Sequence, residues 1–564
     1  MSEIVDLHME TLRTSSLKRY SAEMVPKWVC ENTTIGGVPY SFVDHEYQER
    51  ILGDVSTEIN IRKCSQVGLS EAWARAALAL VKIMRKYTVA YTLPTAHFAG
   101  SFAKTRVDPV IDGSKALREA VHKTMNNNEV KQFGESFLWL RGAASSNAPI
   151  SIPCDHLIHD EVDFSDPEVL AQYLSRLNHS PYKRITKIST PTLPDFGIDK
   201  EFKASRRHFM FTKCTHCGEQ YLPDYYKHVK IPGYNHDLKE ITKATIHRLR
   251  WEEAALLCPK CGKVADLSPA NRKWVWENNA ENHKAVGYQV APFDAPKIVK
   301  MPYLVESSTK YSRRQDFDNF NLGIPAEDSE ATLSSDDFKD LFFPAPRPAG
   351  WTVMGIDVGN TYHVKVGVVN GHGDVRCIHA ERVPMGVFKT RYFQLKAKYG
   401  VVCSVIDSGP HAETVMALQA LDPNLYASVY MKSKSLLTYN LLERDDEESE
   451  GKKFVRQLNV NRSRAFDAYM TFVRSGQLSF DAFVGDSYED IKETIIKHHC
   501  SMKRVRQFDS ESGEMIFSWV KTDGEDHFHH TGLYMHLAAQ IKGVASGTGV
   551  LPLFTFSKLK LQNV

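Results

Sequence analysis

The sequence has almost no net charge, no long hydrophobic run, and none of the regular cysteine spacing of secreted proteins. Its 564 residues include 70 Lys and Arg against 68 Asp and Glu, so any binding of nucleic acid must use local basic patches. No stretch of 18 or more apolar residues occurs, and we expect no membrane span. The first residues lack a charged-then-apolar pattern, so no secretory signal is expected.

Four of the ten cysteines form two C-x-x-C pairs, Cys214 with Cys217 and Cys258 with Cys261. Four thiolates in this arrangement predict a tetrahedral structural zinc site in a reducing compartment. The spacer of about 40 residues is longer than usual, which indicates an additional hairpin or helix between the pairs. A redox-active dithiol is the alternative, but it would not need two pairs.

Residues 59–73 predict a strand, a tight loop and a helix. The P-loop pattern G-x-x-x-x-G-K-[ST] fits with its lysine displaced: Lys63 stands at the first glycine position, Gly68 at the second, and Leu69 at the usual lysine position. A lysine at either end of the loop can reach phosphates cradled by backbone N–H groups, and Ser70 can bind Mg²⁺. The alternative is a simple helix-entry turn at Gly68. The candidate nucleotide-binding loop comprises Lys63, Cys64, Ser65, Gln66, Val67, Gly68, Leu69 and Ser70.

Three side chains outside the loop are further nucleotide-binding candidates. Tyr47 and Gln48 precede the loop, where an aromatic ring can stack on adenine and an amide can read its edge. Arg141 stands where a strand becomes a loop, a position from which it could touch the γ-phosphate bound by a neighbouring subunit. An ordinary amphipathic helix start and a surface arginine are the corresponding alternatives.

A short apolar strand ends in Asp160 and Glu161, about 90 residues after the loop. This is a Walker-B pattern, in which Asp160 serves the Mg²⁺ shell and Glu161 polarises the attacking water. The next strand ends in Ser189 and Thr190, where helicase-like motors sense the γ-phosphate and couple hydrolysis to movement. A plain Ser/Thr-rich turn is the alternative. Repeated β-α units with these groups at strand ends predict a doubly wound parallel sheet.

The C-terminal part places acids at the ends of two further apolar strands, at Asp357 and Asp407. Asp526 and His530 are four residues apart, on one face of an expected helix start. Together these groups predict a two-metal site for phosphodiester cleavage with Mg²⁺ or Mn²⁺. Asp467 is a rival third ligand. We interpret His527 and His529 as groups beside the metals or facing DNA.

The order of these motifs resembles that in the large terminase subunit of tailed phages, of the lambda type. The similar stretches are residues 63–70, 138–147, 155–161, 189–192, the two cysteine pairs, 355–359 and 406–409. The resemblance implies an ATPase that pumps double-stranded DNA into a procapsid and a nuclease that cuts concatemers. It implies that Lys63 contacts phosphates, that Ser70 and Asp160 serve Mg²⁺, that Glu161 is the hydrolytic base, and that Asp357 and Asp407 bind nuclease metals.

The resemblance further implies a small terminase subunit and a portal as partners, a homo-oligomeric ring on that portal, and the host cell cytoplasm as the location. We expect an α/β protein with a P-loop, RecA/helicase-like ATPase core carrying the zinc insert, linked to an RNase H-like nuclease domain. The expected parts are an N-terminal arm (1–40), the ATPase core (41–205), the insert and linker (206–345) and the nuclease with its tail (346–564). The alternatives are a zinc-stabilised DNA-binding or scaffold protein with a degenerate P-loop, and a repair helicase-nuclease.

Overall fold

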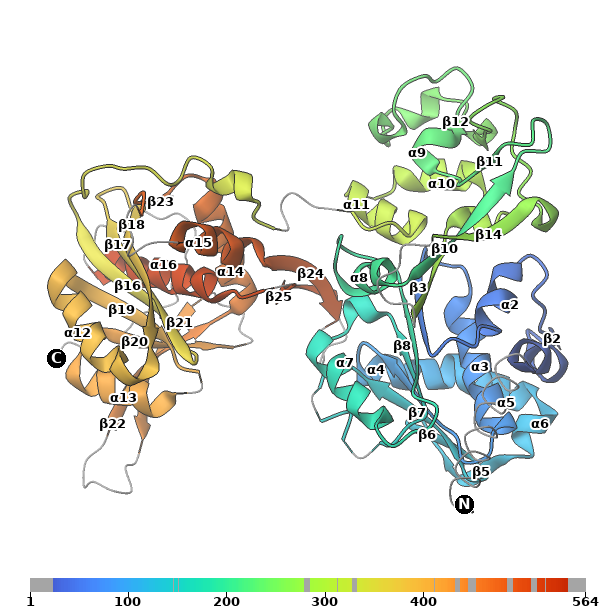
Figure 1. Ribbon diagram of the computed structural model, residues 1–564, viewed down its shortest axis with the longest axis horizontal. Coiled ribbons are helices and arrows are strands. Elements are labelled where there is room, and N and C mark those ends of the chain that lie inside the picture. Colours follow the sequence, from blue (N-terminus) through green and yellow to red (C-terminus); the bar gives the residue numbers. More distant parts are fainter. Residues whose placement is uncertain are drawn as a thin grey trace, which may run out of the picture. The chain divides into compact units, whose positions relative to one another are not determined.

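The computed structural model divides into two units, each with its own sheet (Figure 1). Unit 1 comprises Met1–Asp328 with Arg506–Ile516, and unit 2 comprises Ser329–Val505 with Phe517–Val564. The structure describes residues 24–145, 147–150, 152–277, 285–311, 313–326, 332–409, 411–431, 437–444, 453–483, 490–508, 515–522 and 524–545. The predictions for most of the N-terminal arm and for the C-terminal tail lie outside these residues.

Unit 1 is built on a sheet of eleven strands among the described residues, with the order β11-β10-β15-β3-β9-β8-β4-β7-β6-β5 and β14 paired to β10. The strands are β3 (Glu58–Lys63), β4 (Thr88–Leu93), β5 (Val121–Asn126), β6 (Val130–Phe133), β7 (Ser136–Gly142), β8 (His156–Asp160), β9 (Arg184–Ser189), β10 (Arg206–Lys213), β11 (Gln220–Tyr221), β14 (Arg272–Trp276) and β15 (Ala285–Val290). From β10 to β7 all neighbouring strands are parallel, which confirms the expected parallel α/β core.

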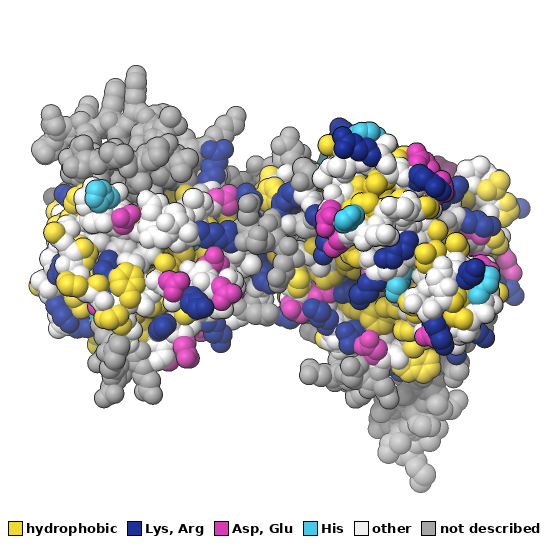
Figure 2. Space-filling model, turned by 90° about the horizontal axis from the view of Figure 1, so that it is seen from above, with side chains coloured by type: hydrophobic (Ala, Val, Ile, Leu, Met, Phe, Trp, Pro, Cys, Tyr) yellow, Lys and Arg dark blue, Asp and Glu magenta, His cyan; other side chains and the backbone are white. Residues whose placement is uncertain are grey.

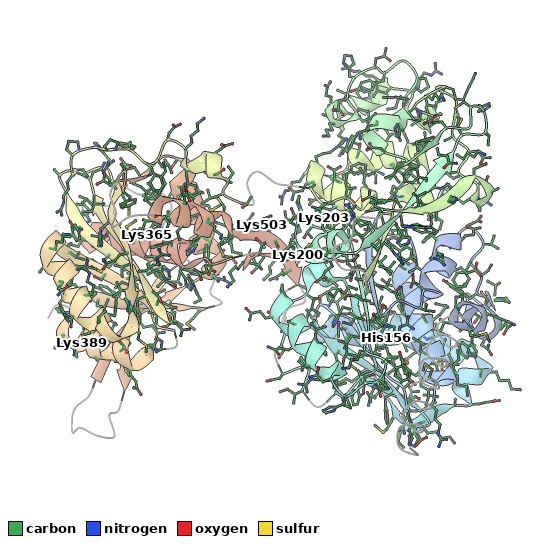
Figure 3. All side chains as sticks on the ribbon, in the orientation of Figure 1. His156, Lys200, Lys203, Lys365, Lys389 and Lys503 are labelled. Atoms are coloured by element: carbon green, nitrogen blue, oxygen red, sulfur yellow. The ribbon has the colours of Figure 1, made fainter. Side chains whose placement is uncertain are left out.

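The central strands of unit 1 are buried on both faces because helices cover both sides of the sheet, as parallel sheets require. The main helices are α2 (Glu46–Leu52), α3 (Leu69–Ile83), α4 (Ala96–Phe102), α5 (Asp108–Gly113), α6 (Lys115–Arg118), α7 (Pro167–Leu174) and α8 (Gly197–Ala204). Helix α3 is rich in Ala and Leu, and eleven of its 15 residues are buried. His156 of β8 is buried as well (Figure 3).

The insert that carries the four cysteines lies within the connection from β10 to β15. It contains α9 (Tyr225–His228), a short pair of strands, β12 (Val229–Lys230) with β13 (Ala255–Leu256), and β14. After β15 come α10 (Met301–Ser308), α11 (Arg314–Phe317) and a π-helix, η9 (Asp318–Leu322). Because β10 and β15 belong to the large sheet, the insert and the sheet share one unit. The units divide at 328/329, and the expected division into parts, with its boundary at 345/346, stays a prediction.

Unit 2 has a mixed eight-stranded sheet among the described residues, with the order β21-β22-β20-β19-β16-β17-β18-β23. Its strands are β16 (Trp351–Asp357), β17 (Thr361–Val369), β18 (Val375–Pro384), β19 (Val401–Asp407), β20 (Leu425–Tyr430), β21 (Leu437–Arg444), β22 (Lys453–Val460) and β23 (Leu478–Phe480). Strands β16, β17 and β18 are antiparallel, and β19 and β20 continue the sheet in parallel with β16. The expected strands ending in Asp357 and Asp407 are therefore confirmed as neighbours.

Helices cover both faces of the sheet in unit 2 and form two cores. Helices α12 (Phe388–Tyr399) and α13 (Ala412–Leu421) lie over one core, and α14 (Arg462–Arg474), α15 (Ile491–Cys500) and α16 (His527–Ala545) over the other. Strands β24 (Met502–Phe508) and β25 (Met515–Lys521) form a separate pair. Lys365 of β17 is fully buried (Figure 3). Its ammonium donates to the carbonyl of Phe528, 2.9 Å away, and burial lowers its pKa to about 7.

None of the helices in the described part of the chain combines the length and the apolar character needed to cross a bilayer.

A glycine in β16 controls how closely α16 approaches the sheet. A Cβ added at Gly355 would collide with backbone atoms of Thr531 and Met535 in α16. We expect Gly355→Ala to destabilise unit 2 by about 3 kcal/mol, since overpacking of this kind forces backbone shifts. Calorimetry and hydrogen exchange of the α16 amides would measure the effect. Gly371→Ala, which has open space at its Cβ, is the control, and equal stability of the two variants would contradict the prediction.

Candidate functional sites

The carboxyl ends of three neighbouring parallel strands converge at one edge of unit 1. Strand β3 ends in Lys63, β8 ends in Asp160, and β9, which lies between them, ends in Ser189. The Lys63 ammonium lies 2.9 Å from Oε1 of Glu161, and the Ser189 hydroxyl is 3.5 Å from the other carboxylate oxygen. The structure therefore brings together residues predicted from three separate motifs.

Lys63 and Glu161 form an ion pair in which Lys63 is buried and Glu161 is partly exposed. Burial opposes the charge on Lys63, but the carboxylates of Glu161 and Asp160 raise its pKa above the ordinary value. Glu161 has φ 57° and ψ 53°, a left-handed conformation that is rare for a residue with a long side chain. Such strain occurs where the surroundings fix a functional side chain.

Asp160 is fully buried beside Glu161 and accepts a hydrogen bond of 2.7 Å from the Tyr91 hydroxyl. Burial, reinforced by the charge of Glu161, raises the pKa of Asp160 to about 6, while Lys63, Tyr91 and Ser70 act in the opposite direction. Ser70 hydrogen-bonds the Asp160 side chain. A hydroxyl and a carboxylate side by side are oxygen ligands that suit Mg²⁺.

The loop between β3 and α3 has the left-handed turns that the P-loop interpretation needs, at Gln66 (φ 64°) and Gly68 (φ 68°). Leu69, at the usual lysine position, is buried in the core under the sheet. The amide of Cys64 donates to the carbonyl of Val290 at 3.0 Å, and the amide of Ser65 donates to that of Phe320 in η9 at 2.7 Å. These two N–H groups already have backbone partners.

Tyr47 and Gln48 lie directly against this loop. The Tyr47 hydroxyl and the Gln48 amide nitrogen both donate to the carbonyl of Val67, at 2.6 and 2.9 Å. The Gln48 amide oxygen accepts from Tyr40 at 2.8 Å. Both side chains are buried, so they hold the loop in place, and their role in reading adenine stays a prediction.

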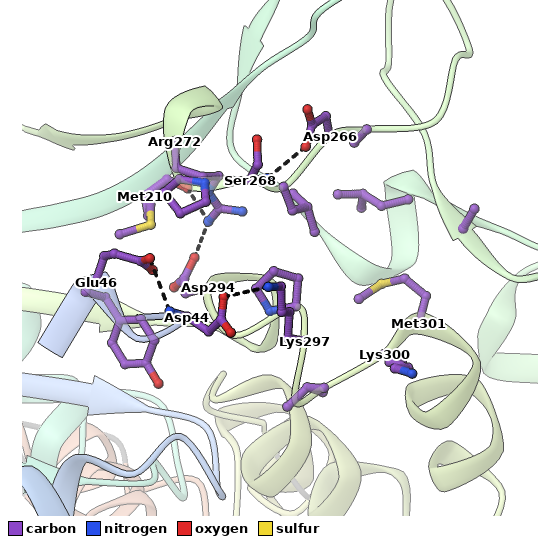
Figure 4. A pocket seen from close by; sticks show the side chains of 18 of the residues that line it. Asp44, Glu46, Met210, Asp266, Ser268, Arg272, Asp294, Lys297, Lys300 and Met301 are labelled. Atoms are coloured by element: carbon purple, nitrogen blue, oxygen red, sulfur yellow. Dashed lines mark hydrogen bonds and ion pairs between the residues drawn. The ribbon is translucent and has the colours of Figure 1, made fainter. Parts of the chain in front are cut away.

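Tyr47 also lines a cavity of about 800 Å³ between α2 and the insert (Figure 4). Two ion pairs border the cavity: Arg272 with Asp294, and Lys297 with Asp44 at 3.0 Å. The remaining lining is mostly apolar, including Met210, Trp274 and Met301. A cavity of this size, with apolar side chains and several charged groups in its lining, suits a small organic ligand or a base.

Arg141 lies apart from this cluster. It is on β7, pairs with Glu129, and its guanidinium stacks on Trp139 with 4.8 Å to the ring centroid. A contact with a neighbour's phosphate would require the pair with Glu129 to open, and this role stays a prediction.

The four cysteines of the insert form one cluster. Their sulfur atoms all lie within 4.8 Å of one another, and both Cys214–Cys261 and Cys217–Cys258 are 3.6 Å apart. A tetrahedral zinc site with bonds of about 2.3 Å places its sulfurs about 3.8 Å apart, so the cluster fits a zinc ion. Each pair ends in a left-handed glycine, Gly218 or Gly262, whose amide donates to the carbonyl of the first cysteine.

The surface of the insert is basic in places, but several of its aromatic residues pack inward. The exposed cations are Lys227, Lys230, Lys239, Lys243, Arg248 and Arg250. Tyr225 is buried in the insert's core, and Tyr226 and Trp251 pack against that core. Figure 2 shows Lys and Arg interspersed with acidic and hydrophobic side chains on the visible face.

A second cluster lies in unit 2, where β16 and β19 are parallel neighbours. Asp357 and Asp407 directly follow the paired residues Ile356 and Ile406. Burial and the nearby charge of Asp357 raise the pKa of Asp407 above its ordinary value. Two carboxylates that repel each other in this way form a place where a cation is favoured.

Asp526 and His530 form the expected pair at the start of α16, with 3.3 Å between carboxylate and Nε2. Although burial opposes the charge of Asp526, the hydrogen bond from His530 holds its pKa well below the usual range. His530 Nδ1 lies 2.8 Å from the Tyr430 hydroxyl. Asp467 is held by Arg504 and by the indole of Trp519, at 3.0 and 2.9 Å.

Comparison with known proteins finds a family for the segment that contains the first of these clusters. Residues 44–277 match the family model described as "Phage terminase large subunit gpA, ATPase domain". This segment is therefore an ATPase domain of the gpA family of phage terminase large subunits. The matched segment contains the whole strand-end cluster and the four cysteines. No curated protein matches the terminase chain.

Solved structures of other large terminases are similar to this terminase chain at low identity. The large terminase of bacteriophage HK97 is 11% identical, with a TM-score of 0.47 over 92% of this chain and 99% of that one. The ATPase domain of the Thermus phage P74-26 terminase is 13% identical (TM-score 0.31, 49% of this chain and 91% of that one). The nuclease of the phage G20c terminase is 14% identical (TM-score 0.24, 36% and 94%). These scores are too low to carry over any residue or mechanism.

Two buried groups at the ATPase edge escaped the sequence analysis. Asp163 is fully buried and accepts hydrogen bonds from Thr192, through amide and hydroxyl, and from the amide of Ile198. It fixes the segment after β9, and burial raises its pKa to about 7. The second buried group is Tyr91 on β4, whose hydroxyl donates to Asp160. Neither residue belongs to a sequence motif. Asp163, however, stands two positions after Glu161, and an acid so close to a Walker-B pair could have indicated a buried group at this edge of the sheet.

The cysteine cluster gives a direct test of metal content. We expect Cys258→Ser in the terminase chain to abolish bound zinc and to lower the melting temperature, because a structural zinc contributes folding free energy. Elemental analysis and calorimetry would measure both. Cys30→Ser, outside the cluster, should retain the metal. Equal zinc in both variants would refute the zinc assignment.

Proposed function

We propose that this terminase chain is the motor subunit of viral DNA packaging, in which unit 1 hydrolyses ATP to pump double-stranded DNA into a procapsid. The observation that carries the proposal is the convergence of Lys63, Ser70, Asp160 and Glu161 at one sheet edge, inside the segment matching the terminase ATPase family. Strand ends of this kind are where phosphates bind in doubly wound sheets.

In this proposal each group at the edge has one task. Lys63 contacts the β- and γ-phosphates, and Ser70 and Asp160 hold Mg²⁺, which neutralises developing charge on the phosphates. Glu161 orients the attacking water and accepts its proton. Ser189 touches Glu161, so Ser189 and Thr190 couple the hydrolytic carboxylate to the β9 end. Tyr47 and Gln48 face the base, which the cavity beside Tyr47 would accommodate, and Arg141 acts on a neighbouring subunit.

We propose that unit 2 is an RNase H-like nuclease that cuts concatemeric DNA. The support is topological: three antiparallel strands, β16 to β18, continue into parallel β19 and β20, with acids at the ends of the two central strands. Asp357 and Asp407 would hold Mg²⁺ or Mn²⁺, with Asp526 or His530 as a further ligand; such ions stabilise both oxygens of a phosphodiester displacement.

The partners follow from the family. We propose that the chain binds double-stranded DNA and a small terminase subunit, that it works as a homo-oligomeric ring on the portal of the procapsid, and that it acts in the host cell cytoplasm. The insert, stabilised by zinc, presents exposed cations that can contact phosphates.

One observation favours a non-motor alternative. Leu69 is buried where P-loops usually have lysine, and the amides of Cys64 and Ser65 are bonded to backbone carbonyls. A zinc-stabilised DNA-binding or scaffold protein with a degenerate P-loop would have these features. DNA-stimulated ATP hydrolysis by the purified chain separates the two functions, and unwinding of forked DNA would favour a repair helicase-nuclease instead.

Glu161→Gln should lower DNA-stimulated ATP hydrolysis by at least about 100-fold, because the amide cannot accept the proton of the attacking water. Nucleotide binding, measured by fluorescence titration, should persist, because the glutamine oxygen can still accept a hydrogen bond from Lys63 and the bound phosphates would supply the opposite charge that Lys63 loses. Glu135→Gln removes an exposed carboxylate that pairs with Arg85 and should hydrolyse ATP normally. An unchanged rate in Glu161→Gln would sink the motor assignment.

Asp357→Asn should abolish Mn²⁺-dependent cleavage of plasmid DNA while ATP hydrolysis survives, because the two sites lie in different units. A gel assay and a phosphate-release assay on the same preparation would measure both. Asp374→Asn, in the turn after β17, is the matched control. Simultaneous loss of both activities in Asp357→Asn would argue against two separate catalytic sites.

A further inference from the structure

Two histidines lie beside Asp357, in addition to the acids of the predicted nuclease site. The antiparallel pairing of β16 with β17 places His363 directly opposite Asp357. His527, the first residue of α16, brings its Nδ1 to 2.8 Å from the Asp357 carboxylate. One ligand atom from each of the three residues lies within 4.8 Å of the other two. Three different elements, two strands and a helix, thus converge on one point.

His363 is the informative member of the group. Its side chain is 4% exposed, and neither ring nitrogen makes a hydrogen bond of normal geometry to any described residue. A buried polar group without a partner costs about 1–3 kcal/mol. The ring stacks on His527, with 4.5 Å between centroids and 13° between planes, so both imidazoles present their edges side by side near Asp357.

The other histidines around this point differ from His363. His498 accepts a hydrogen bond from the amide of Phe528 and lies 3.4 Å from Glu525, and His530 is bonded to Tyr430 and Asp526. His529 has unpartnered ring nitrogens as well, but it packs among aromatic rings and belongs to no group with a carboxylate among the described residues. Burial without a partner and proximity to an acid coincide at His363.

We propose that Asp357, His363 and His527 bind one divalent transition-metal ion, a site richer in nitrogen than the set of Asp357, Asp407, Asp526 and His530 that the sequence suggests. Imidazole ligands suit Zn²⁺, Co²⁺, Ni²⁺ or Fe²⁺ and are accepted by Mn²⁺, whereas Mg²⁺ demands oxygen ligands. The ion would give His363 the partner it lacks. It would replace the hydrogen bond by which His527 holds Asp357. The inference deepens the proposed nuclease function and rests on it only for the ion's role in cleavage.

The test is Mn²⁺ binding to the full chain, followed by electron paramagnetic resonance. Mn²⁺ is the chosen probe because thiolates bind it weakly, so the cysteine cluster does not interfere. His363→Phe and His527→Phe keep an aromatic ring in place and should each weaken Mn²⁺ binding at least tenfold. His372→Phe, in the exposed turn after β17, should leave the affinity unchanged. Unaltered affinity in both site variants would overturn the proposal.

A second variant guards against simple misfolding. His363→Asp replaces one nitrogen ligand by oxygen and should retain an ion while shifting the ratio of Mg²⁺ to Mn²⁺ affinity at least tenfold towards Mg²⁺. A purely structural histidine would not produce this shift. Anomalous diffraction from Mn²⁺-soaked wild-type crystals gives the same answer without mutation. An ion bound between Asp357 and Asp407 with no nitrogen ligand would refute the assignment.

DNA cleavage measured in parallel separates this inference from the proposed nuclease. If Mn²⁺ binds through His363 but no metal supports cleavage, the site exists and the nuclease function fails. If the chain cuts DNA while Mn²⁺ affinity is insensitive to His363 and His527, the nuclease stands and the histidine site falls.

Discussion

The ion pair between Lys63 and Glu161 is the interaction on which the ATPase edge depends. It joins the ends of β3 and β8, two strands that are not neighbours, across the end of β9. A buried ion pair adds little net stability, but removing one partner leaves an uncompensated charge that costs about 3–5 kcal/mol. The displaced lysine and the Walker-B acid therefore form one structural unit, and neither can be exchanged without disturbing the other.

The backbone around Glu161 explains how a strained residue is kept at this position. A left-handed conformation costs about 1–3 kcal/mol for a residue other than glycine. Asp163, two positions later, holds three hydrogen bonds to Thr192 and Ile198, and its own amide donates to Ser189. The turn is thereby tied to the end of β9 from both sides. The conformation of Glu161 is therefore set by its neighbours rather than by its own backbone preference.

Local patterns predicted much of this architecture because they depend on sequence-near interactions. Apolar strands ending in Asp160, Ser189, Asp357 and Asp407 were recognisable from periodicity and from polar groups at their ends, and all four strands are present. The helix pair of Asp526 and His530 follows from the spacing of four residues. These features need no knowledge of distant partners.

The features that sequence could not supply depend on pairings between remote segments. Strand β15 lies between β10 and β3 in the large sheet, so the insert with the four cysteines connects two strands of that sheet instead of following it in the chain. The π-helix η9 reaches the amide of Ser65 from more than 250 positions away. The position of His363 opposite Asp357 could have been predicted from the sequence. A short turn after Asp357 forces an antiparallel register that sets the two residues opposite each other. Applying that register rule to the hairpin would have found it.

The cluster around Glu161 and the cluster around Asp357 share one electrostatic feature, a carboxylate paired with a nitrogen donor of the protein. An acid shielded from water at or just after a strand end is costly unless it has a hydrogen-bond donor, and the protein supplies one internally: Lys63 for Glu161 and His527 for Asp357, at 2.9 and 2.8 Å. In the proposals above, each donor is also the group that contacts the incoming ligand, phosphate in one unit and metal in the other. Under those proposals, ligand binding at either centre is an exchange of partners. Its affinity reflects the difference between two sets of contacts, not the new contacts alone.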